Sequence, residues 1–483
     1  MIFDTITLIL GAAIIILAVL TSLLSPFRRA DVKTLRSFDV EKPNDDVLSP
    51  LHSVIEPTGR FRNAMEKESA PADRAETMRS LDVEAPSDDL STSQHLNIST
   101  SQPLTLLITV QQKQAQMLER HLPQFLSQDY APGFEVVVVA EKGDSDTEDV
   151  LNRYAGNPLL YSTYIPDSSR YMSRKKLAIT LGVKAAHNEW IVMTDAFCSP
   201  SGNHWLRAIA SHIAPSDDST SQPLNDKTSQ PLNDKTLQPL NDSTSQPLND
   251  STSQPLNDST SPNLIIGYSN YDDEARPYYR FERLQQACYT MREARRGKAY
   301  RAMGCNVAFR KSEFIAGDGF RGNLEHTRGE YDFLVNKFSQ RRSTAVANEP
   351  DAWIIDDAPT RHEWRSRHIY YMHTRKYLAR SFRHRLLPFI DELALHLCFL
   401  AIIGIGVFAG LTSRWILLGA AVVALVIAVC MRTSFARKTV RAYGEDIASW
   451  RLYPYELSGI WHKLYQHLRY WRADKAGFTS HKV

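Results

Sequence analysis

The chain has 483 residues, enough for one large domain or two ordinary ones. Its 56 lysine and arginine residues nearly balance 54 aspartate and glutamate residues, so the net charge indicates no nucleic-acid partner. Five cysteines occur without a Cys-x-x-Cys pair, which argues against a disulfide framework or a zinc site and suits a reducing compartment.

The first element predicted along the chain is a membrane anchor within residues 1–29. Residues 6–24 carry no charge over 19 positions, about enough to cross ~30 Å of hydrocarbon. A cleaved signal peptide is the alternative, but the stretch lacks a basic leading region and a small-x-small cleavage site. We therefore expect an uncleaved transmembrane helix.

Two low-complexity stretches are predicted to be disordered. Residues 30–102 are rich in Ser, Pro, Asp and Glu, and "RSFDVEKPNDD" at 36–46 recurs as "RSLDVEAPSDD" at 79–89. Within 218–261 an eight-residue unit close to "DSTSQPLN" repeats. Each unit offers one apolar residue and a proline, too little to bury a core, and is far shorter than a solenoid repeat of roughly 20 residues or more.

The remaining residues, 103–385 without that insertion, predict an α/β domain. Buried-strand patterns alternate with amphipathic helical patterns. Such an order favours an open parallel sheet that binds ligands along the carboxyl ends of its strands. The expected strands are 103–111, 134–142, 161–167 and 189–200, and the expected helices are 114–128 and 175–188.

A pair of apolar segments, 393–411 and 415–431, predicts a transmembrane hairpin within 386–431, followed by a tail at 432–483. A buried helical hairpin in a soluble core is the alternative. Basic residues flank the outer ends of all three spans, whereas the short loop between the last two has only Arg414. By the positive-inside rule, the α/β domain and the tail are cytoplasmic.

Several stretches of the domain, in this order and spacing, resemble the membrane-bound family 2 glycosyltransferases of bacteria. They are "LPQFLSQDYAPGFEVVVVAEKGDSD", "RKKLAITLGVKAAHNEWIVMTDAFCSPSGNHWL", "IIGYSNYDD", "MGCNVAFRKSEFIAGDGF" and "GEYDFLVNKF". The resemblance implies a GT-A (Rossmann-like) fold and inverting transfer of a hexose from a nucleotide-diphospho-sugar. It also implies a membrane-lipid or lipid-linked glycan acceptor at the inner membrane, in cell-envelope polysaccharide or glycolipid synthesis.

The same resemblance suggests donor-binding residues. Glu141 and Asp146 match the acidic turn that holds the nucleoside in the family, and Lys175 matches a basic residue near the donor. The alternatives are that the two acids favour the start of the following helix and that Lys175 is a solvated helix charge.

Asp195 ends an apolar strand and is the expected metal ligand. With the donor diphosphate it would coordinate Mg²⁺ or Mn²⁺, which stabilises the departing nucleoside diphosphate. The family usually has a second aspartate two positions later, where this chain has Phe197. Either metal affinity is reduced, or another oxygen substitutes.

The catalytic base is expected within "RGEYDFLV" at 328–335, because an inverting transfer needs a carboxylate to take the acceptor proton. Glu330 or Asp332 would serve, with Tyr331 between them in place of a family acid. A surface acidic turn that opens a helix is the alternative.

The stretch "WRSRHIYYMHTRKY" at 364–377 takes the place of the family's Gln-x-x-Arg-Trp motif. Arg367 falls at the glutamine position, with Tyr370 and Tyr371 where the family has Arg-His. The candidates for gripping a diphosphate or anionic lipid are Arg365, Arg367, Arg375 and Lys376; alternatively they are only the basic flank of the next span.

These departures leave three functional hypotheses open. The leading one is an active membrane glycosyltransferase. A catalytically weakened or inactive protein of the same fold, acting by nucleotide or partner binding, is the second. An unrelated membrane-anchored scaffold is the third.

Overall fold

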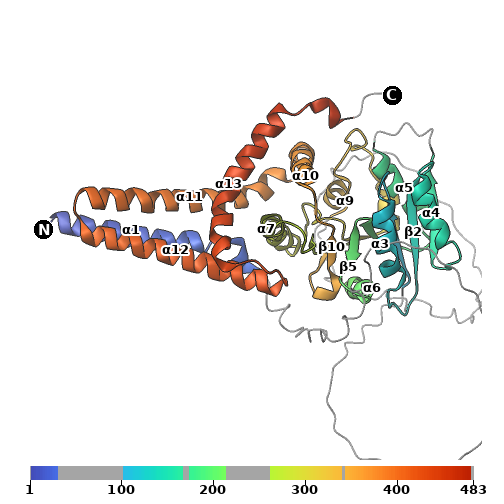
Figure 1. Ribbon diagram of the computed structural model, residues 1–483, viewed down its shortest axis with the longest axis horizontal. Helices are drawn as coiled ribbons and strands as arrows, with labels where there is room; N and C mark the ends of the chain where they lie inside the picture. The colour runs from blue at the N-terminus through green and yellow to red at the C-terminus, as the bar shows by residue number, and fades with distance from the viewer. Residues whose placement is uncertain (1, 31–101, 167–172, 214–261, 340–342, 480–483) are drawn as a thin grey trace, which may run out of the picture. The chain divides into compact units, whose positions relative to one another are not determined.

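A computed structural model of the chain describes residues 2–30, 102–166, 173–213, 262–339 and 343–479 (Figure 1). The disorder predicted for 30–102 and for the repeats at 218–261 concerns segments that lie, except for residues 30 and 102, outside the described residues. Those two expectations stay predictions.

The centre of the domain is a mixed sheet of seven strands in the order β3-β2-β1-β4-β8-β6-β9. The four strands from the predicted run, β1 to β4, are parallel, as expected. β8 runs antiparallel to β4 and β6, so the parallel character does not extend across the whole sheet. The strands are β1 (Leu104–Thr109), β2 (Phe134–Glu141), β3 (Leu160–Ile165), β4 (Trp190–Asp195), β6 (Leu264–Gly267), β8 (Val307–Arg310) and β9 (Thr344–Ala347).

Helices cover both faces of this sheet, which is why its first strands are continuous apolar runs. In β1, Leu106 and Ile108 pack with α3, α4 and α6, whereas Leu107 packs with α5. The helices are α3 (Ala115–Leu126), α4 (Ser145–Arg153), α5 (Arg174–Ala185), α6 (Trp205–Ala210), α7 (Pro277–Ala294), α8 (Lys311–Ala316), α9 (Glu330–Phe338) and α10 (Arg361–Thr374).

A smaller three-stranded sheet adjoins the end of β4. Its order is β5-β10-β7, with β10 antiparallel to β5 and parallel to β7. The strands are β5 (Cys198–Pro200), β7 (Ser269–Tyr271) and β10 (Ile354–Asp356). Because β5 follows β4 after a two-residue turn, this sheet carries side chains from three distant segments toward Asp195.

Among the described residues, three helices are long and apolar enough to cross a membrane, as expected. They are α1 (Ile2–Ser22), α11 (Ser381–Leu411) and α12 (Trp415–Ala442), and they lie side by side in Figure 1. The tail contains a further helix, α13 (Ser449–Arg472), which the sequence analysis did not predict. Short 3-10 turns are η1 (Pro26–Arg29), η3 (Pro350–Ala352) and η4 (Lys475–Gly477).

A buried arginine joins these helices near the end of the apolar segments. Arg432 of α12 donates to Asp391 of α11 at 2.5 Å, to Glu456 of α13 at 2.8 Å and to the Thr21 carbonyl of α1 at 3.0 Å. Tyr289 of α7 donates to Asp391 at 2.8 Å. The apolar helices and the α/β domain are therefore linked through one charged cluster, whose ionic side chains are at most 2 % exposed.

Candidate functional site

A cavity of about 470 Å³ opens where β1 and β4 end. Its walls come from the residues after these strands, from α5, α7, α9 and α10, and from the small sheet. The charged residues that line it are Lys175, Asp195, Glu282, Arg283, Arg301, Arg328, Glu330, Asp332, Asp356, Asp357, Glu363 and Arg367. This position agrees with the sequence-based expectation of a ligand site at the carboxyl ends of the strands.

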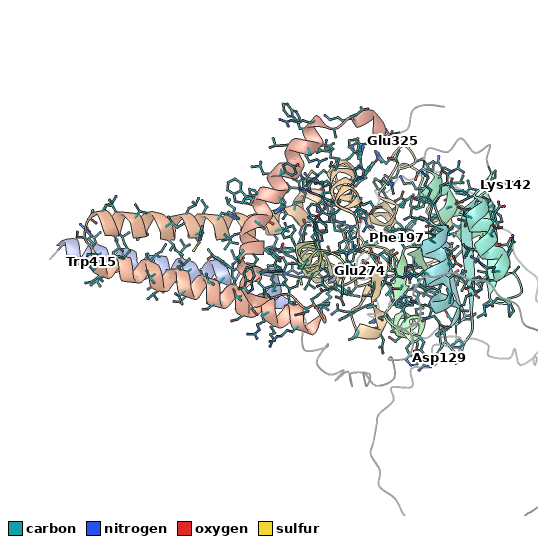
Figure 2. The ribbon with its side chains drawn as sticks, viewed as in Figure 1. Asp129, Lys142, Phe197, Glu274, Glu325 and Trp415 are labelled. Atoms are coloured by element: carbon teal, nitrogen blue, oxygen red, sulfur yellow. A yellow bond between two sulfur atoms is a disulfide. The ribbon has the colours of Figure 1, made fainter. Side chains whose placement is uncertain are left out.

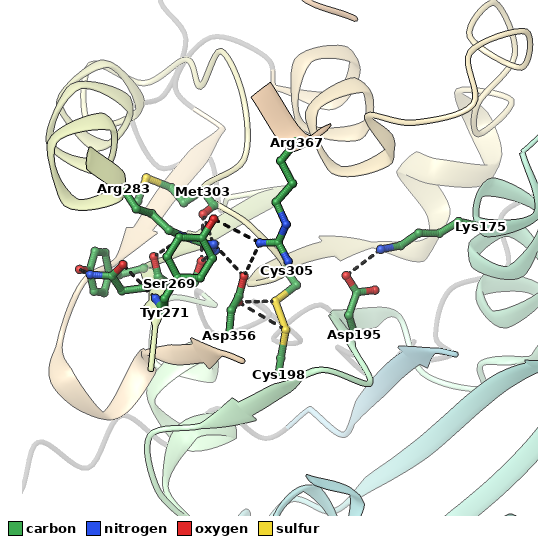
Figure 3. Close-up of polar contacts among 12 residues, drawn as sticks. Lys175, Asp195, Cys198, Ser269, Tyr271, Arg283, Met303, Cys305, Asp356 and Arg367 are labelled. Carbon is green, nitrogen blue, oxygen red and sulfur yellow. Dashed lines mark hydrogen bonds and ion pairs between the residues drawn. A yellow bond between two sulfur atoms is a disulfide. The ribbon is translucent and has the colours of Figure 1, made fainter. Parts of the chain in front are cut away.

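An ion pair between Lys175 and Asp195 occupies one wall (Figure 3). The Lys175 ammonium lies 2.6 Å from Asp195 Oδ2, and Thr109 donates its hydroxyl to Oδ1 at 2.8 Å. The side chains of Lys175 and Asp195 are only 10 % and 3 % exposed. Ser173 caps the start of α5 and so fixes the backbone from which Lys175 extends.

Two aromatic rings flank the Lys175 ammonium. The Tyr331 ring centroid is 4.9 Å away and the Phe197 centroid is 5.9 Å away, within the range of cation–π contacts. Phe197, labelled in Figure 2, also lies 5.4 Å from the Arg367 guanidinium. Burial first, and the negative charge of Asp195 second, raise the pKa of Tyr331 well above its usual range, so this phenol stays neutral.

The residues at Asp195 do not fit a divalent cation. Both carboxylate oxygens already accept hydrogen bonds, one of them from an ammonium, and Phe197 offers no ligand atom. Within the described part of the chain, the cluster of three or more potential metal ligands is Cys198, Cys305 and Asp356, and Asp195 is not in it. Mg²⁺ and Mn²⁺ prefer oxygen ligands, and at Asp195 both oxygens are already engaged by Lys175 and Thr109.

A second charged cluster, which the sequence analysis missed, surrounds Asp356 at the end of β10 (Figure 3). Arg283 and Arg367 lie 2.8 and 3.4 Å from Asp356 Oδ2, and Arg367 also donates to the Tyr271 hydroxyl at 3.3 Å. Asp356 could have been found, because it closes a short apolar strand as Asp195 does. Arg283 could not, since nothing in the sequence distinguishes it from other helix arginines.

The expectation that the cysteines form no disulfide was wrong; the expected reducing compartment stays a prediction. Cys198 of β5 and Cys305 form a disulfide, although 107 positions separate them in the sequence. Their sulfurs also lie 3.5 and 3.2 Å from Asp356 Oδ1. Cys198 follows β4 and Cys305 precedes β8, and the antiparallel pairing of these two strands brings the cysteines together. Spacing rules based on Cys-x-x-Cys motifs do not detect a pairing that tertiary structure creates.

The predicted acidic residues open α9 and are buried rather than on the surface. Gly329 precedes them with φ +93°, and a Cβ at this position would lie 2.8 Å from the Thr374 side chain. Asp332 pairs with Arg301 at 3.3 Å. Burial raises the pKa of Asp332, and the nearby Arg301 lowers it by less, so the net direction is upward.

The loop before α9 is held by Lys176. Its ammonium donates to the carbonyls of Asn323 and His326 at 2.6 Å each, and burial lowers its pKa to about 8. Glu330 accepts from the Ser173 hydroxyl at 3.4 Å. The first turn of α5 therefore supports both Lys175 and the acidic start of α9.

The four basic candidates on and just after helix α10 do not lie together. Arg367 lines the cavity together with Tyr370 and Tyr371, which follow it on the helix. Arg365 lies instead beside the Tyr465 ring of α13, at 6.0 Å. Arg375 contacts His467, and Lys376 lies over the Tyr470 ring, both also on α13. Of these four, the structure places Arg367 in the cavity wall.

The two residues expected to hold the nucleoside do not line the cavity. Glu141 ends β2 and pairs with Arg174 at 2.9 Å. Asp146 is exposed in the first turn of α4, where an acidic side chain favours the helix start. The position of Asp146 therefore agrees with the alternative that this acid favours the start of the following helix.

A further pair on the cavity wall was not predicted. His368 of α10 lies 2.9 Å from Glu282 of α7. Burial alone would lower the pKa of His368, but Glu282 outweighs it and the net shift is upward; the pKa of Glu282 moves down for the same reason. Beside this ion pair, the rings of Tyr279 and Trp364 stack at 4.3 Å, which adds an aromatic surface to the cavity.

No protein-family model matches the chain, and no curated protein matches it. Among solved structures, it is similar to a mannosyltransferase from Pyrobaculum calidifontis in complex with GDP-Man and Mn²⁺, at 16 % identity and a TM-score of 0.40, covering 70 % of this chain and 86 % of that one. It is also similar to residues 1–349 of TarS from S. aureus with UDP-GlcNAc, at 12 % identity and a TM-score of 0.35, covering 74 % and 92 %. At these TM-scores the shared architecture is loose, and neither a family nor an activity follows from it.

Proposed function

We propose that this protein transfers a sugar from a nucleotide-diphospho-sugar to an acceptor presented at the membrane. The observation that carries the proposal is one cavity, at the carboxyl ends of the strands, that combines several cationic side chains with buried carboxylates. The resemblance of the sequence to membrane-bound family 2 glycosyltransferases, with their GT-A fold, supports the same reaction.

The cationic side chains suit a diphosphate. Lys175 and Arg367 both lie near the Phe197 ring, at 5.9 and 5.4 Å from its centroid, so an anion beside this ring would be close to both charges. Arginine recognises phosphate oxygens through paired hydrogen bonds, and lysine acts as a compact point charge. These two residues are the proposed diphosphate contacts.

In the proposed reaction, the acceptor hydroxyl oxygen forms a bond to the anomeric carbon of the donor. The bond from that carbon to the diphosphate breaks, and its electron pair leaves with the nucleoside diphosphate. The acceptor proton passes to a carboxylate. We assign this base to Asp332, a buried carboxylate of the cavity wall; Glu330 also lines the cavity but accepts a hydrogen bond from Ser173 of α5.

The acceptor is proposed to be a membrane lipid or a lipid-linked glycan. Helix α10, which lines the cavity, contacts α13. α13 exposes Trp450, Trp461 and Trp471, and its last turn carries Arg469 and Arg472. Exposed aromatic and basic residues of this kind are typical of helices in the membrane interface. An inner-membrane protein with a cytoplasmic domain, in envelope polysaccharide or glycolipid synthesis, follows from the charge bias and the resemblance.

One observation favours a second candidate, a nucleotide-binding protein without turnover. Asp195 is paired with Lys175, and Asp332 is paired with Arg301, so two acids expected to act in catalysis each already face a cation. Carboxylates held in ion pairs are also common in sites that have lost chemistry and kept structure.

A donor screen separates these candidates. Full-length protein in detergent with bacterial lipid extract is incubated with the common UDP-, GDP- and dTDP-sugars, and release of nucleoside diphosphate is measured. The active enzyme consumes one donor, and Asp332→Asn stops this while the exposed control Asp149→Asn does not. Binding of nucleoside diphosphate without consumption of any donor would favour the second candidate.

A further inference from the structure

We propose that Lys175 takes the place of the divalent cation at this site, so that the donor diphosphate is neutralised by the protein and needs no metal. This inference rests on the proposed function. The inference assigns the contact with the donor phosphates to Lys175. The sequence-based expectation assigned it to Mg²⁺ or Mn²⁺ bound to Asp195.

The Lys175 ammonium lies where a metal bound to Asp195 would have to lie. It lies 2.6 Å from Asp195 Oδ2, at the end of β4, where a metal ligated by this carboxylate would otherwise lie. A fixed positive charge already occupies that point. A divalent cation could bind to Asp195 Oδ2 only after the Lys175 ammonium had been displaced. Otherwise the metal and the ammonium would be close neighbours on one carboxylate, and like charges repel strongly in a poorly solvated site.

The neutral side chain of Phe197 also favours a site without a metal. A carboxylate at this position would supply the missing metal ligand, but it would also lie between Lys175 and Arg367 and pair with both of them. The neutral ring instead contacts the two cations through its π face. It leaves their remaining hydrogen-bond donors free to meet phosphate oxygens.

Neighbouring side chains hold the Lys175 ammonium in position. Asp195 itself is held by the Thr109 hydroxyl at 2.8 Å, and the neutral Tyr331 ring covers the ammonium from the other side at 4.9 Å. Lysine is a strong phosphate ligand when its stem is fixed. Asp195 is therefore a positioning residue for Lys175, and Lys175 is the group that contacts the departing diphosphate.

The test measures binding of UDP, GDP and dTDP to the full-length protein by isothermal titration calorimetry, in EDTA and in Mn²⁺. We expect binding in EDTA with an affinity within about threefold of that in Mn²⁺, because no metal bridge is needed. Lys175→Met weakens it by about 10- to 100-fold in both buffers, the loss of one charged phosphate contact. Lys175→Arg keeps most of the affinity.

The matched control is Lys184→Met, which removes an exposed charge from the last turn of the same helix and leaves binding unchanged. Binding that disappears in EDTA and returns with Mn²⁺ overturns the inference and leaves the proposed function standing. Equal affinities of Lys175→Met and wild type also overturn it. Failure of UDP, GDP and dTDP to bind in either buffer overturns both. The EDTA comparison uses the wild type, so it holds even if a variant does not fold.

Discussion

Lys175 of α5 and Asp195 of β4 form a 2.6 Å ion pair in the cavity wall, and Thr109 holds the second carboxylate oxygen. This relationship explains how the strand can end in a single aspartate. On the proposal made above, the positive charge beside Asp195 comes from this lysine, twenty positions earlier in the sequence, and not from a metal. Asp195 is then needed for orientation rather than for metal ligation.

Asp195→Asn tests this division of roles. The amide keeps the shape of the side chain and a hydrogen-bond acceptor for Lys175, but it removes the negative charge. Binding of UDP or GDP in EDTA should stay within about threefold of wild type, since the phosphate contact remains. The free energy of unfolding should fall by about 1–3 kcal/mol, because a buried ammonium loses its counter-ion.

Calorimetry and thermal unfolding measure the two effects. Asp129→Asn is the control, since it breaks an exposed ion pair with Arg207 and should change stability by less than about 0.5 kcal/mol. A large loss of nucleotide affinity in Asp195→Asn that is seen in Mn²⁺ but not in EDTA, without unfolding, would instead favour a metal ligand.

The base assignment predicts a pH dependence. Asp332 must be unprotonated to accept a proton, so kcat rises with pH on the acid side of the profile. Because the pKa of Asp332 is raised, the midpoint of this rise should lie above the usual aspartate pKa of about 4. Arg301 lowers the pKa of Asp332, and Arg301→Met should therefore move this midpoint to higher pH. A midpoint that stays in place would argue against Asp332 and would direct attention to Glu330.

Glu445, in the turn after α12, predicts a pH-dependent stability. Burial raises its pKa to about 7, Arg280 lowers it in part, and Asn270 donates a hydrogen bond. The folded state holds this proton more tightly than the unfolded state. The stabilisation is full below about pH 4.5 and is lost as pH rises through 7, a change of roughly 3 kcal/mol at most.

Thermal unfolding of the purified protein across this pH range measures the effect. Glu445→Gln mimics the protonated form, so its midpoint should change less between pH 5 and pH 8 than that of the wild type. Parallel curves for the two proteins would show that Glu445 does not titrate in this window.

Arg432 is predicted to be the least replaceable charge in the helical part of the chain. Arg432→Met leaves Asp391 and Glu456 buried without their shared cation, which should cost about 3–5 kcal/mol of unfolding free energy. Arg437→Met, on an exposed position of the same helix, is the control and should have little effect. Equal unfolding midpoints would show that the cluster does not stabilise the fold.

The first half of the domain followed from the sequence because its signals are local. Apolar runs and amphipathic periods predicted β1 to β3, α3 and α5 within a few residues, whereas the single strand expected at 189–200 is two strands, β4 and β5, in different sheets. The same applies to the three apolar helices. In each case, the residues that decide the element lie inside the element.

The parts of the site that sequence reasoning missed are non-local. The position of Asp356 depends on a small sheet whose strands lie far apart in the chain, and the Cys198–Cys305 disulfide depends on the pairing of β4 with the distant strand β8. The separation of Arg365 from Arg367 has a simpler cause. Once 361–374 is helical, Arg365 and Arg367 lie on different faces of α10, and Arg365 falls beside α13 while Arg367 lines the cavity.

A structure of the full-length protein with UDP or GDP, obtained in EDTA, tests the central claim most directly. The account predicts diphosphate oxygens at about 2.7–2.9 Å from Lys175 Nζ, beside Phe197 and within reach of Arg367. A diphosphate held away from this wall, or a structure in Mn²⁺ that shows the metal on Asp195 with Lys175 displaced, would contradict it.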